Sequence, residues 1–231
     1  MISIIIPVFN QAEHLANCLD SLKKQTFNNY EIIVVDDGSK DDVSSVVAKY
    51  KKIFSYKIFY YGQKNQGASI ARNLGAKMAR GQYLLFCDAD TILNPTMLES
   101  MKICLEKNPG ASFCYSSFIW GKKKFLLWPY DAQKLKQMPY INTSSLLRRD
   151  RFPGFDEKLK RFQDWDLWLT MSEQGRVGIW LNQILYKVNL GGRQTMSGWL
   201  PSFAYKWLPF LPAVKKYNQT KDIIMKKHGL K

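Results

Sequence analysis

Three short apolar runs, SIIIPVFN (3–10), EIIVVDDGS (31–39) and YLLFCDAD (83–90), each end in polar residues. Apolar runs of this length that alternate with segments of helical period are typical of β-α-β units, in which parallel strands are buried on both faces. The sequence therefore predicts an α/β fold with a mostly parallel central sheet flanked by helices. Open sheets of this kind bind ligands at the carboxyl ends of their strands, where the three polar ends would lie.

The same alternation extends over residues 1–118. It predicts strands at 2–8, 31–35, 56–61, 83–87 and 111–119. The helices between them have recognisable starts at Asn10 with Glu13, at Ser39 with Asp42, at Gly67 to Ser69, and at Asn94 followed by Pro95.

The pattern is looser beyond residue 119. It predicts a turn at 121–124, a short edge segment at 125–128 and a helix near 164–174. In that helix Trp165, Trp168, Leu169 and Ser172 fall at helical spacing and share a face toward the core. We expect a mixed second half attached to the parallel first half.

Length and charge set the broad class. The chain has 231 residues, 46% of them hydrophobic, and single cores keep growing to roughly 250 residues. One large domain, or one domain with a small appendage, is therefore expected. Lysine and arginine total 34 against 19 for aspartate and glutamate, a formal charge of +15. Such a charge attracts phosphate, whether in nucleic acid, lipid headgroups or a phosphorylated substrate.

The cysteines and apolar segments exclude some classes. Cys18, Cys87, Cys104 and Cys114 have neither CxxC spacing nor a neighbouring histidine, so we expect free thiols rather than a zinc site or a redox dithiol. The first residues lack the basic region of a secretory signal, and there is no apolar run of about 18 residues. These features predict a cytoplasmic protein.

The polar strand ends suit a nucleoside diphosphate. Asp36 can accept a hydrogen bond from a pyrimidine N–H, and Phe9 can stack on a base. Arg72, which follows the segment KNQGAS (64–69), can pair with phosphate through its fork of donors. Asp88 and Asp90 provide the hard oxygen ligands that magnesium or manganese prefers.

Each motif also has a structural interpretation. DDGS (36–39) is a good helix entry, and DAD (88–90) is compatible with a solvated strand end. GAS (67–69) with ARN (71–73) could simply begin a helix in which Gly67 and Gly75 allow close packing. The occurrence of all these motifs in order, each at the end of a predicted strand, favours ligand binding.

Residues 2–192 resemble the family 2 glycosyltransferases with a GT-A, Rossmann-like fold. The resemblance is densest in SIIIPVFNQAEHLANCLDSLKKQTFNNYEIIVVDDGSKDD (3–42) and NQGASIARNLGAKMARGQYLLFCDAD (65–90). It implies that the nucleotide-sugar is bound by Pro7, Val8, Phe9, Asn10, Asp36, Asn65, Gly67, Arg72, Asp88 and Ala89. It also implies that Asp88-Ala89-Asp90 is a DxD motif that contacts the ribose and a manganese or magnesium ion, with Asp90 and Asp88 as metal ligands.

The second half of the resemblance supplies a catalytic base. GFDE (154–157) and QDWDLWL (163–169) are similar to the family segment that ends in an acidic pair, whose aspartate is the base. Asp164 takes that position, and Gln163 stands where the family usually has glutamate. The resemblance implies direct displacement with inversion. A place in the first turn of a helix favours the ionised form of Asp164.

The resemblance weakens beyond Gly192. The family often has a histidine near the metal there, whereas this chain has none in GGRQTMSG (191–198), and Arg193 is the remaining candidate to face the diphosphate. His14 and His228 are assigned no role. We expect one GT-A catalytic domain at 1–195, with a nucleotide-sugar-binding half (1–118) and an acceptor and base half (119–195), followed by an aromatic and basic segment at 196–231.

The predicted function is transfer of a sugar from a UDP, dTDP or GDP donor to a glycan or lipid-linked acceptor, in cell-surface polysaccharide, glycolipid or lipid-linked oligosaccharide synthesis. The aromatic stretch at 199–212 and the lysines at 215–227 suggest peripheral binding to an anionic membrane on its cytoplasmic face. The alternative for that stretch is a packing element. Two other functions remain: a degenerate homologue that binds nucleotide-sugars without catalysis, and a nucleic-acid-binding protein, which the spread of basic residues disfavours.

Overall fold

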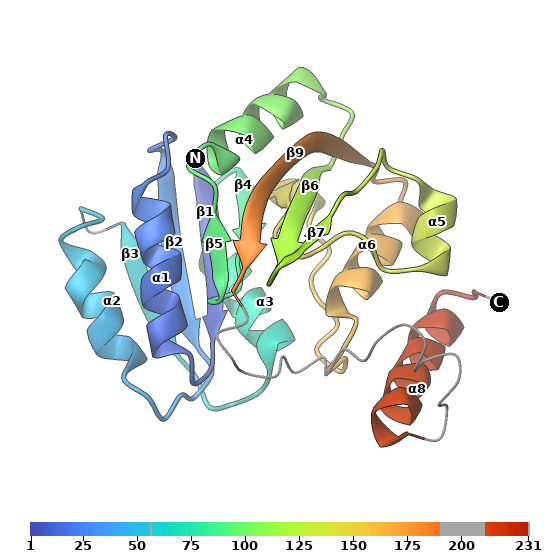
Figure 1. The fold of residues 1–231 in the computed structure, drawn as a ribbon, viewed down its shortest axis with the longest axis horizontal. Helices are drawn as coiled ribbons and strands as arrows, with labels where there is room; N and C mark the ends of the chain where they lie inside the picture. Colours follow the sequence, from blue (N-terminus) through green and yellow to red (C-terminus); the bar gives the residue numbers. More distant parts are fainter. Residues whose placement is uncertain (56, 190–210, 231) are drawn as a thin grey trace.

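A computed structural model describes residues 1–55, 57–189 and 211–230 (Figure 1). Its strands are β1 (Ile2–Val8), β2 (Tyr30–Asp36), β3 (Ile58–Gly62), β4 (Tyr83–Phe86), β5 (Thr91–Leu93), β6 (Phe113–Trp120), β7 (Lys123–Phe125), β8 (Leu146–Arg148) and β9 (Gly178–Val188). Its helices are α1 (Ala12–Lys23), α2 (Val43–Lys51), α3 (Ala68–Met78), α4 (Met97–Lys107), α5 (Ala132–Gln137), α6 (Gln163–Glu173) and α8 (Pro212–Lys227), with a 3-10 turn at Arg149–Arg151.

The strands form one mixed sheet in the order β3-β2-β1-β4-β8-β6-β9-β5, and β7 pairs with β6 beside that path. The strands β1 to β4 pair in parallel, β8 runs antiparallel to both β4 and β6, and β9 pairs in parallel with β6. The predicted α/β fold, a largely parallel sheet with a mixed second half, is therefore confirmed.

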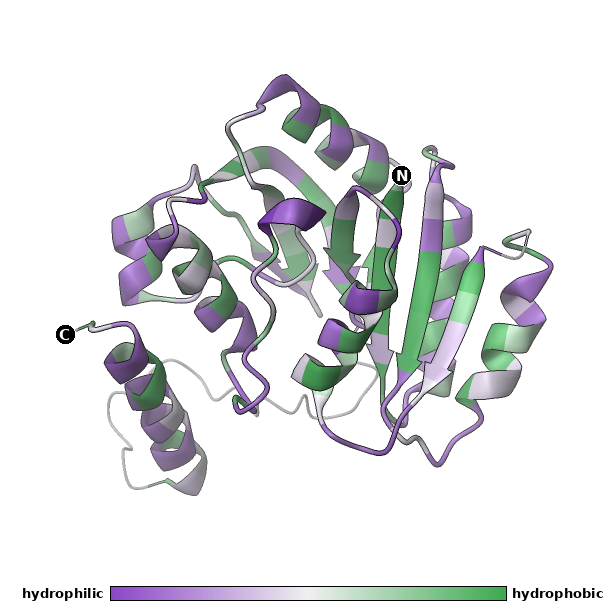
Figure 2. Cartoon of the chain, turned by 180° about the vertical axis from the view of Figure 1, so that it is seen from behind, coloured by the Kyte–Doolittle hydropathy of each residue, from purple (hydrophilic) through white to green (hydrophobic). Residues whose placement is uncertain are grey.

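Apolar strands make the centre of this sheet. Every residue of β1 and β2 is buried, as expected for strands covered on both faces by helices. Figure 2 shows the central strands as largely hydrophobic and the helices as a mixture of hydrophobic and hydrophilic residues. Gly75 lets α3 approach β1, because a Cβ on Gly75 would lie 2.4 Å from the Cγ2 atom of Ile5. Close packing is thus confirmed at Gly75, but at Gly67 it is wrong, since none of the described atoms lies within 4 Å of a Cβ built there.

The predicted strands of the first half are all present, within two or three residues. The sequence missed β5, β8 and β9, and it placed the edge segment at 125–128 rather than at β7. Strands β5 and β8 are only three residues long, and most of β9 is half-buried or exposed. None of the three therefore has the apolar run that marks a buried strand. The inward face of α6 is confirmed, since Trp165, Trp168 and Leu169 are buried.

Three predicted helix starts were wrong by one to three residues. Asp42 rather than Ser39 caps α2, and α1 and α4 begin at Ala12 and Met97 rather than after Asn10 and Asn94. The physical reason for α1 and α2 is that Asn10 and Ser39 form hydrogen bonds between the loop after β1 and the loop after β2, instead of capping the helices. The Ser39 hydroxyl accepts from the Asn10 amide at 3.0 Å, and the Asn10 Oδ1 atom accepts from the amide of residue 40 at 2.7 Å.

All four cysteines are free, as predicted. None of the helices within the described ranges combines the length and the apolar character that crossing a bilayer requires. The predicted aromatic stretch at 199–212 falls almost entirely, and Arg193 entirely, outside the described residues.

Candidate active site

The loops after β1 and β2 form one side of the candidate site. Pro7 and Val8 are buried at the end of β1, where they pair with Val35 and Asp36 of β2. Phe9 follows directly and is 43% exposed, so its ring is accessible to a ligand. Asn10 adopts a left-handed backbone (φ 53°), which turns the chain away from the strand direction.

Asp36 is held from two sides. The amide of Ser39 donates to its Oδ1 atom at 2.9 Å, and the hydroxyl of Tyr60 donates to its Oδ2 atom at 2.7 Å. Burial, and then the hydrogen bond to Asp36 and its charge, raise the pKa of Tyr60 to about 12. Tyr60 thus fixes the orientation of the predicted base-binding carboxylate. The sequence analysis missed it, although Tyr60 lies within a predicted strand beside the one that ends at Asp36.

Asp37 shapes the loop that leads into α3. Its carboxylate accepts from the side chain of Gln63 at 2.7 Å and from the amides of Gln66 and Gly67 at 2.8 Å each. Gly67 caps α3 with a left-handed φ of 97°, a conformation that favours glycine. The predicted residues Asn65 and Gly67 both lie in this loop, and the side chain of Asn65 is exposed.

Arg72 links the two halves of the site. Its Nη2 atom lies 2.6 Å from the Oδ1 atom of Asp88, and its Nη1 atom donates to the Oε1 atom of Gln163 at 2.7 Å. The guanidinium also lies over the ring of Phe155, 5.4 Å from its centroid. The structure therefore brings together Arg72, the end of β4 and the start of α6.

Two buried polar atoms near the start of α3, Nε of Arg72 and Oγ of Ser69, have no hydrogen-bond partner within the described part of the chain. Arg72 is 6% exposed, and an unsatisfied buried donor is costly. The amides in the first turn of a helix and its dipole also favour an anion. A phosphate group at this place would match all of these groups, so the residues fit a diphosphate.

Gln163 satisfies two neighbours because an amide is both donor and acceptor. Its Oε1 atom accepts from Arg72, and its Nε2 atom donates to the carbonyl of Leu159 at 2.8 Å. A glutamate at this position would accept only, and would add a second carboxylate against Arg72. With glutamine there, Asp88 is the only carboxylate among the described residues that forms an ion pair with Arg72.

The DAD motif follows β4, with Ala89 buried between two partly exposed carboxylates. Burial, and then the charge of Asp88, raise the pKa of Asp90 to about 7, while Arg72 opposes the shift. Within the described residues no group of three or more acidic, cysteine or histidine side chains is arranged to hold a metal ion. Two carboxylates are nevertheless a suitable partial ligand set for manganese or magnesium, which commonly take further oxygens from substrate phosphates.

Asp164 is the second residue of α6, and its Oδ1 atom accepts from the amide of Trp165 at 2.9 Å. Burial raises the pKa of Asp164, and it outweighs the opposing hydrogen bond from Trp165 and the charge of Arg72. The direction of this pKa shift is opposite to the one expected from the place of Asp164 in the first turn of a helix, which favours the ionised form. A carboxylate with a raised pKa is a stronger base once it is ionised.

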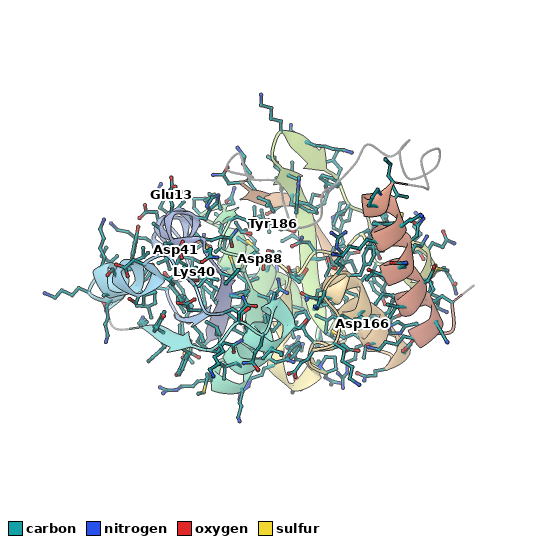
Figure 3. The ribbon with its side chains drawn as sticks, turned by 90° about the horizontal axis from the view of Figure 1, so that it is seen from below. Glu13, Lys40, Asp41, Asp88, Asp166 and Tyr186 are labelled. Atoms are coloured by element: carbon teal, nitrogen blue, oxygen red, sulfur yellow. The ribbon has the colours of Figure 1, made fainter. Side chains whose placement is uncertain are left out.

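Strand β9 adds a residue that the sequence analysis missed. Tyr186 is buried, and burial followed by the charges of Asp164 and Asp88 raises its pKa well above the usual value. Its hydroxyl therefore lies within electrostatic reach of both candidate site carboxylates. Figure 3 shows Asp88 and Tyr186 near the middle of the molecule, with Lys40 and Asp41 to one side and Asp166 to the other. The missed strand explains the missed residue.

Comparisons with known proteins agree with this fold. Residues 3–167 match the family described as Glycosyl transferase family 2. An uncharacterized glycosyltransferase of Haemophilus influenzae is 37% identical over 188 residues, which cover 75% of this chain and 63% of that protein. One of Rickettsia conorii is 32% identical over 206 residues, covering 83% of this chain and 33% of its own length.

Solved structures share the architecture. Staphylococcus aureus TarS 1-349 in complex with UDP-GlcNAc has a TM-score of 0.75 and 20% identity, covering 89% of this chain and 63% of that chain. The mannosyltransferase PcManGT of Pyrobaculum calidifontis, in complex with GDP-Man and Mn²⁺, has a TM-score of 0.69 and 16% identity. The match covers 83% of this chain and 57% of that chain. The predicted GT-A fold is thereby confirmed.

The extent of these matches establishes the family of the chain. It belongs to glycosyl transferase family 2. It spans about a third of the length of the Rickettsia conorii and Rickettsia felis relatives that it matches.

Proposed function

We propose that this chain is an inverting glycosyltransferase that moves a sugar from a nucleoside-diphosphate-sugar to an acceptor hydroxyl. The observation that carries the proposal is the junction at Arg72. This buried guanidinium joins Asp88 to the first residue of α6. Its Nε atom and the hydroxyl of Ser69, three residues earlier in α3, have no hydrogen-bond partner among the described residues. The candidate base Asp164 follows directly in α6.

The donor half of the proposal rests on the loops after β1, β2 and β4. Asp36 and the exposed ring of Phe9 would contact the base, and Arg72 with the start of α3 would contact the diphosphate. Two proteins of the same fold were crystallised with UDP-GlcNAc and with GDP-Man. We propose a UDP, dTDP or GDP donor.

The chemical step needs one base and a stabilised leaving group. Asp164 takes the proton of the acceptor hydroxyl as that oxygen forms a bond to the anomeric carbon. The bond from the anomeric carbon to the diphosphate oxygen breaks, and the electron pair leaves with the nucleoside diphosphate. Arg72 lies where it would stabilise the charge that develops on the diphosphate. A manganese or magnesium ion held by Asp88 and Asp90 would supply further charge neutralisation.

The replacement of glutamate by glutamine at position 163 favours a second candidate, a homologue that binds nucleotide-sugars without transferring them. Position 163 contacts Arg72, and Asp164 is retained. The substitution therefore changes the charge around the diphosphate and leaves the base in place. For this reason we prefer the active transferase.

Binding of nucleotides by calorimetry tests the proposal. We expect one of UDP, GDP, dTDP and CMP to bind the wild-type chain more tightly with manganese than without it. The variant Asp90→Ala should lose the effect of manganese, whereas Asp150→Ala should keep it, since the Asp150 side chain is 75% exposed and forms an ion pair with its neighbour Arg151. Failure of all four nucleotides to bind would refute the donor site.

Release of sugar distinguishes the two candidates. If the matching sugar nucleotide binds and is slowly hydrolysed or transferred, the chain is an active transferase. If it binds and stays intact with every acceptor, including lipid-linked and glycan acceptors, the homologue that only binds nucleotide-sugars is favoured.

We further propose that the acceptor is a glycan or a lipid-linked molecule of cell-surface synthesis, reached from the cytoplasmic face of an anionic membrane. The support is the overall charge of +15 and the exposed lysines Lys215, Lys216 and Lys226 of α8. The chain should sediment with vesicles that contain phosphatidylglycerol and remain in the supernatant with neutral vesicles. Equal recovery in both supernatants would contradict membrane binding.

A further inference from the structure

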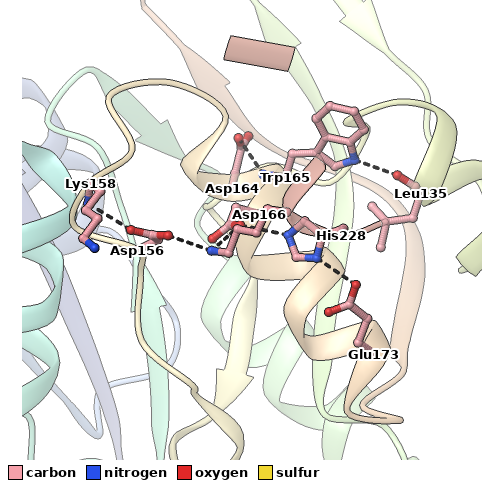
Figure 4. Close-up of polar contacts among 9 residues, drawn as sticks. Leu135, Asp156, Lys158, Asp164, Trp165, Asp166, Glu173 and His228 are labelled. Carbon is pink, nitrogen blue, oxygen red and sulfur yellow. Dashed lines mark hydrogen bonds and ion pairs between the residues drawn. The ribbon is translucent and has the colours of Figure 1, made fainter. Parts of the chain in front are cut away.

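The end of α8 is tied to the helix that carries Asp164 (Figure 4). The Nζ atom of Lys227 lies 2.7 Å from the Oδ2 atom of Asp156 and 2.7 Å from the Oδ1 atom of Asp166. The Nε2 atom of His228 lies 2.9 Å from the same Oδ1 atom, and its Nδ1 atom lies 2.8 Å from the Oε1 atom of Glu173. Two adjacent residues thus contact three carboxylates, two of which belong to α6.

The contacts of Asp166 and His228 matter for stability because both side chains are buried. The side chain of Asp166 is 4% exposed and that of His228 is 2% exposed. A buried carboxylate that loses its partner destabilises a protein strongly. Both ring nitrogens of His228 face carboxylate oxygens, and both can donate only when the imidazole is protonated. Hydrogen bonds to Asp156 and Asp166 outweigh burial and raise the pKa of Lys227, which keeps this side chain charged.

The tied segment contains the candidate base. Asp166 follows Asp164 by two residues within the first turns of α6. Asp156 follows Phe155, whose ring lies against the guanidinium of Arg72. The contacts of α8 therefore reach both sides of the loop that joins the diphosphate region to the base.

The backbone at the start of α6 needs support. Phe162 precedes the helix with φ 56°, a left-handed conformation that is uncommon and costly for a bulky residue. The ring of Phe162 packs edge-to-face on Tyr217 of α8, with centroids 5.0 Å apart. On its other side it meets the ring of Trp165 at 5.6 Å. Strained positions persist where the surroundings hold them, and α8 supplies part of that surrounding.

We propose that Lys227 and His228 are positioning residues that hold the first turn of α6, and with it Asp164, in the geometry required for sugar transfer. The inference rests on the proposed function for its catalytic part. The sequence analysis assigned no role to His228, because partners from distant parts of the chain leave no local pattern. Through these contacts α8 acts on the reaction without touching the donor.

The variant Lys227→Met tests the proposal in the full chain. The Lys227 side chain is 37% exposed, so methionine can keep its aliphatic contacts. The matched control is Lys107→Met, the same change at an exposed lysine in the last turn of α4. The conservative variant is Lys227→Arg. Three quantities are measured for each: kcat for transfer, the Kd of the nucleoside diphosphate, and amide hydrogen exchange in peptides spanning residues 156–168.

Misplacement of a catalytic group by about 1 Å can cost about a hundredfold in rate. We therefore expect Lys227→Met to lower kcat by roughly ten- to a hundredfold and to speed exchange in 156–168, while the Kd of the nucleotide stays within about twofold. Lys107→Met should match the wild type, and Lys227→Arg should recover most of the rate. A general loss of stability would instead raise exchange across all helices and weaken nucleotide binding.

The outcomes separate the two proposals. Unchanged exchange in 156–168 overturns the positioning role whatever the rates are. Faster exchange with an unchanged kcat also overturns it, because α6 would then be loosened without effect on the base. If the wild type binds no nucleotide and transfers no sugar, the proposed function fails, and the exchange data alone decide whether α8 holds α6.

Discussion

Replacing Asp164 with asparagine is expected to lower kcat for sugar transfer by about 10²- to 10⁴-fold, the usual contribution of a general base. Asparagine keeps the size of the side chain and can still accept the hydrogen bond from the amide of Trp165. Nucleotide affinity should therefore stay close to that of the wild type. Steady-state rates, together with calorimetry on the same preparations, measure both quantities.

The control for Asp164→Asn is Asp150→Asn, which makes the same chemical change at an exposed carboxylate in the turn after β8. This variant should match the wild type in both measurements. A rate for Asp164→Asn within about threefold of the wild type would exclude Asp164 as the base. The acidic group would then have to come from elsewhere in the site.

The pH dependence of the transfer rate is an independent test of Asp164 as the base. Burial raises the pKa of Asp164, so the protonated, inactive form persists to higher pH than for an ordinary aspartate. The rate of the wild type should fall as pH falls through this raised pKa, and it should be level above it. The residual rate of Asp164→Asn should lack this acidic limb. By linkage, the raised pKa also means that the ionised carboxylate costs folding stability, a cost that disappears as the pH falls and Asp164 is protonated.

Local sequence patterns predicted the first half of the molecule well because β1, β2 and β4 are buried along their whole length. Such strands appear as continuous apolar runs, and the polar residues after them lie at one sheet edge by topology alone. The contact between Arg72 and Asp88 follows from this rule, since α3 and the end of β4 meet at that edge.

The second half follows a different logic. Strand β9 is half-exposed, and its sequence lacks a clear hydrophobic period. The electrostatic contact of Tyr186 with Asp164 could therefore not be predicted from the sequence. The contact from Gln163 to Arg72 joins residues 91 positions apart in the chain, and no local pattern marks such a pair. Tyr60 on Asp36 and His228 on Asp166 are of the same kind. What escaped prediction is chiefly side-chain pairing between elements, which the family resemblance did not supply either.

Arg72→Met should weaken binding of the nucleoside diphosphate by about ten- to a hundredfold, because a hydrogen bond to a charged group contributes about 1.5–3 kcal/mol. Methionine preserves packing on Phe155 but removes the donors to Asp88 and Gln163, together with the unpartnered Nε. Arg80→Met, the same change at an exposed arginine over Phe59, is the control and should bind nucleotide as the wild type does.

Arg72→Lys separates charge from geometry at this position. Lysine keeps one positive charge but cannot reach Asp88, Gln163 and a phosphate in the fixed fork that guanidinium provides. If charge alone matters, Arg72→Lys should bind nucleotide as tightly as the wild type. If the fork matters, as the two short contacts of 2.6 and 2.7 Å suggest, its affinity should lie nearer to that of Arg72→Met. If Arg72→Met binds the nucleotide as tightly as the wild type does, and its unfolding temperature is unchanged, the diphosphate does not bind at Arg72. The donor site would then have to lie elsewhere.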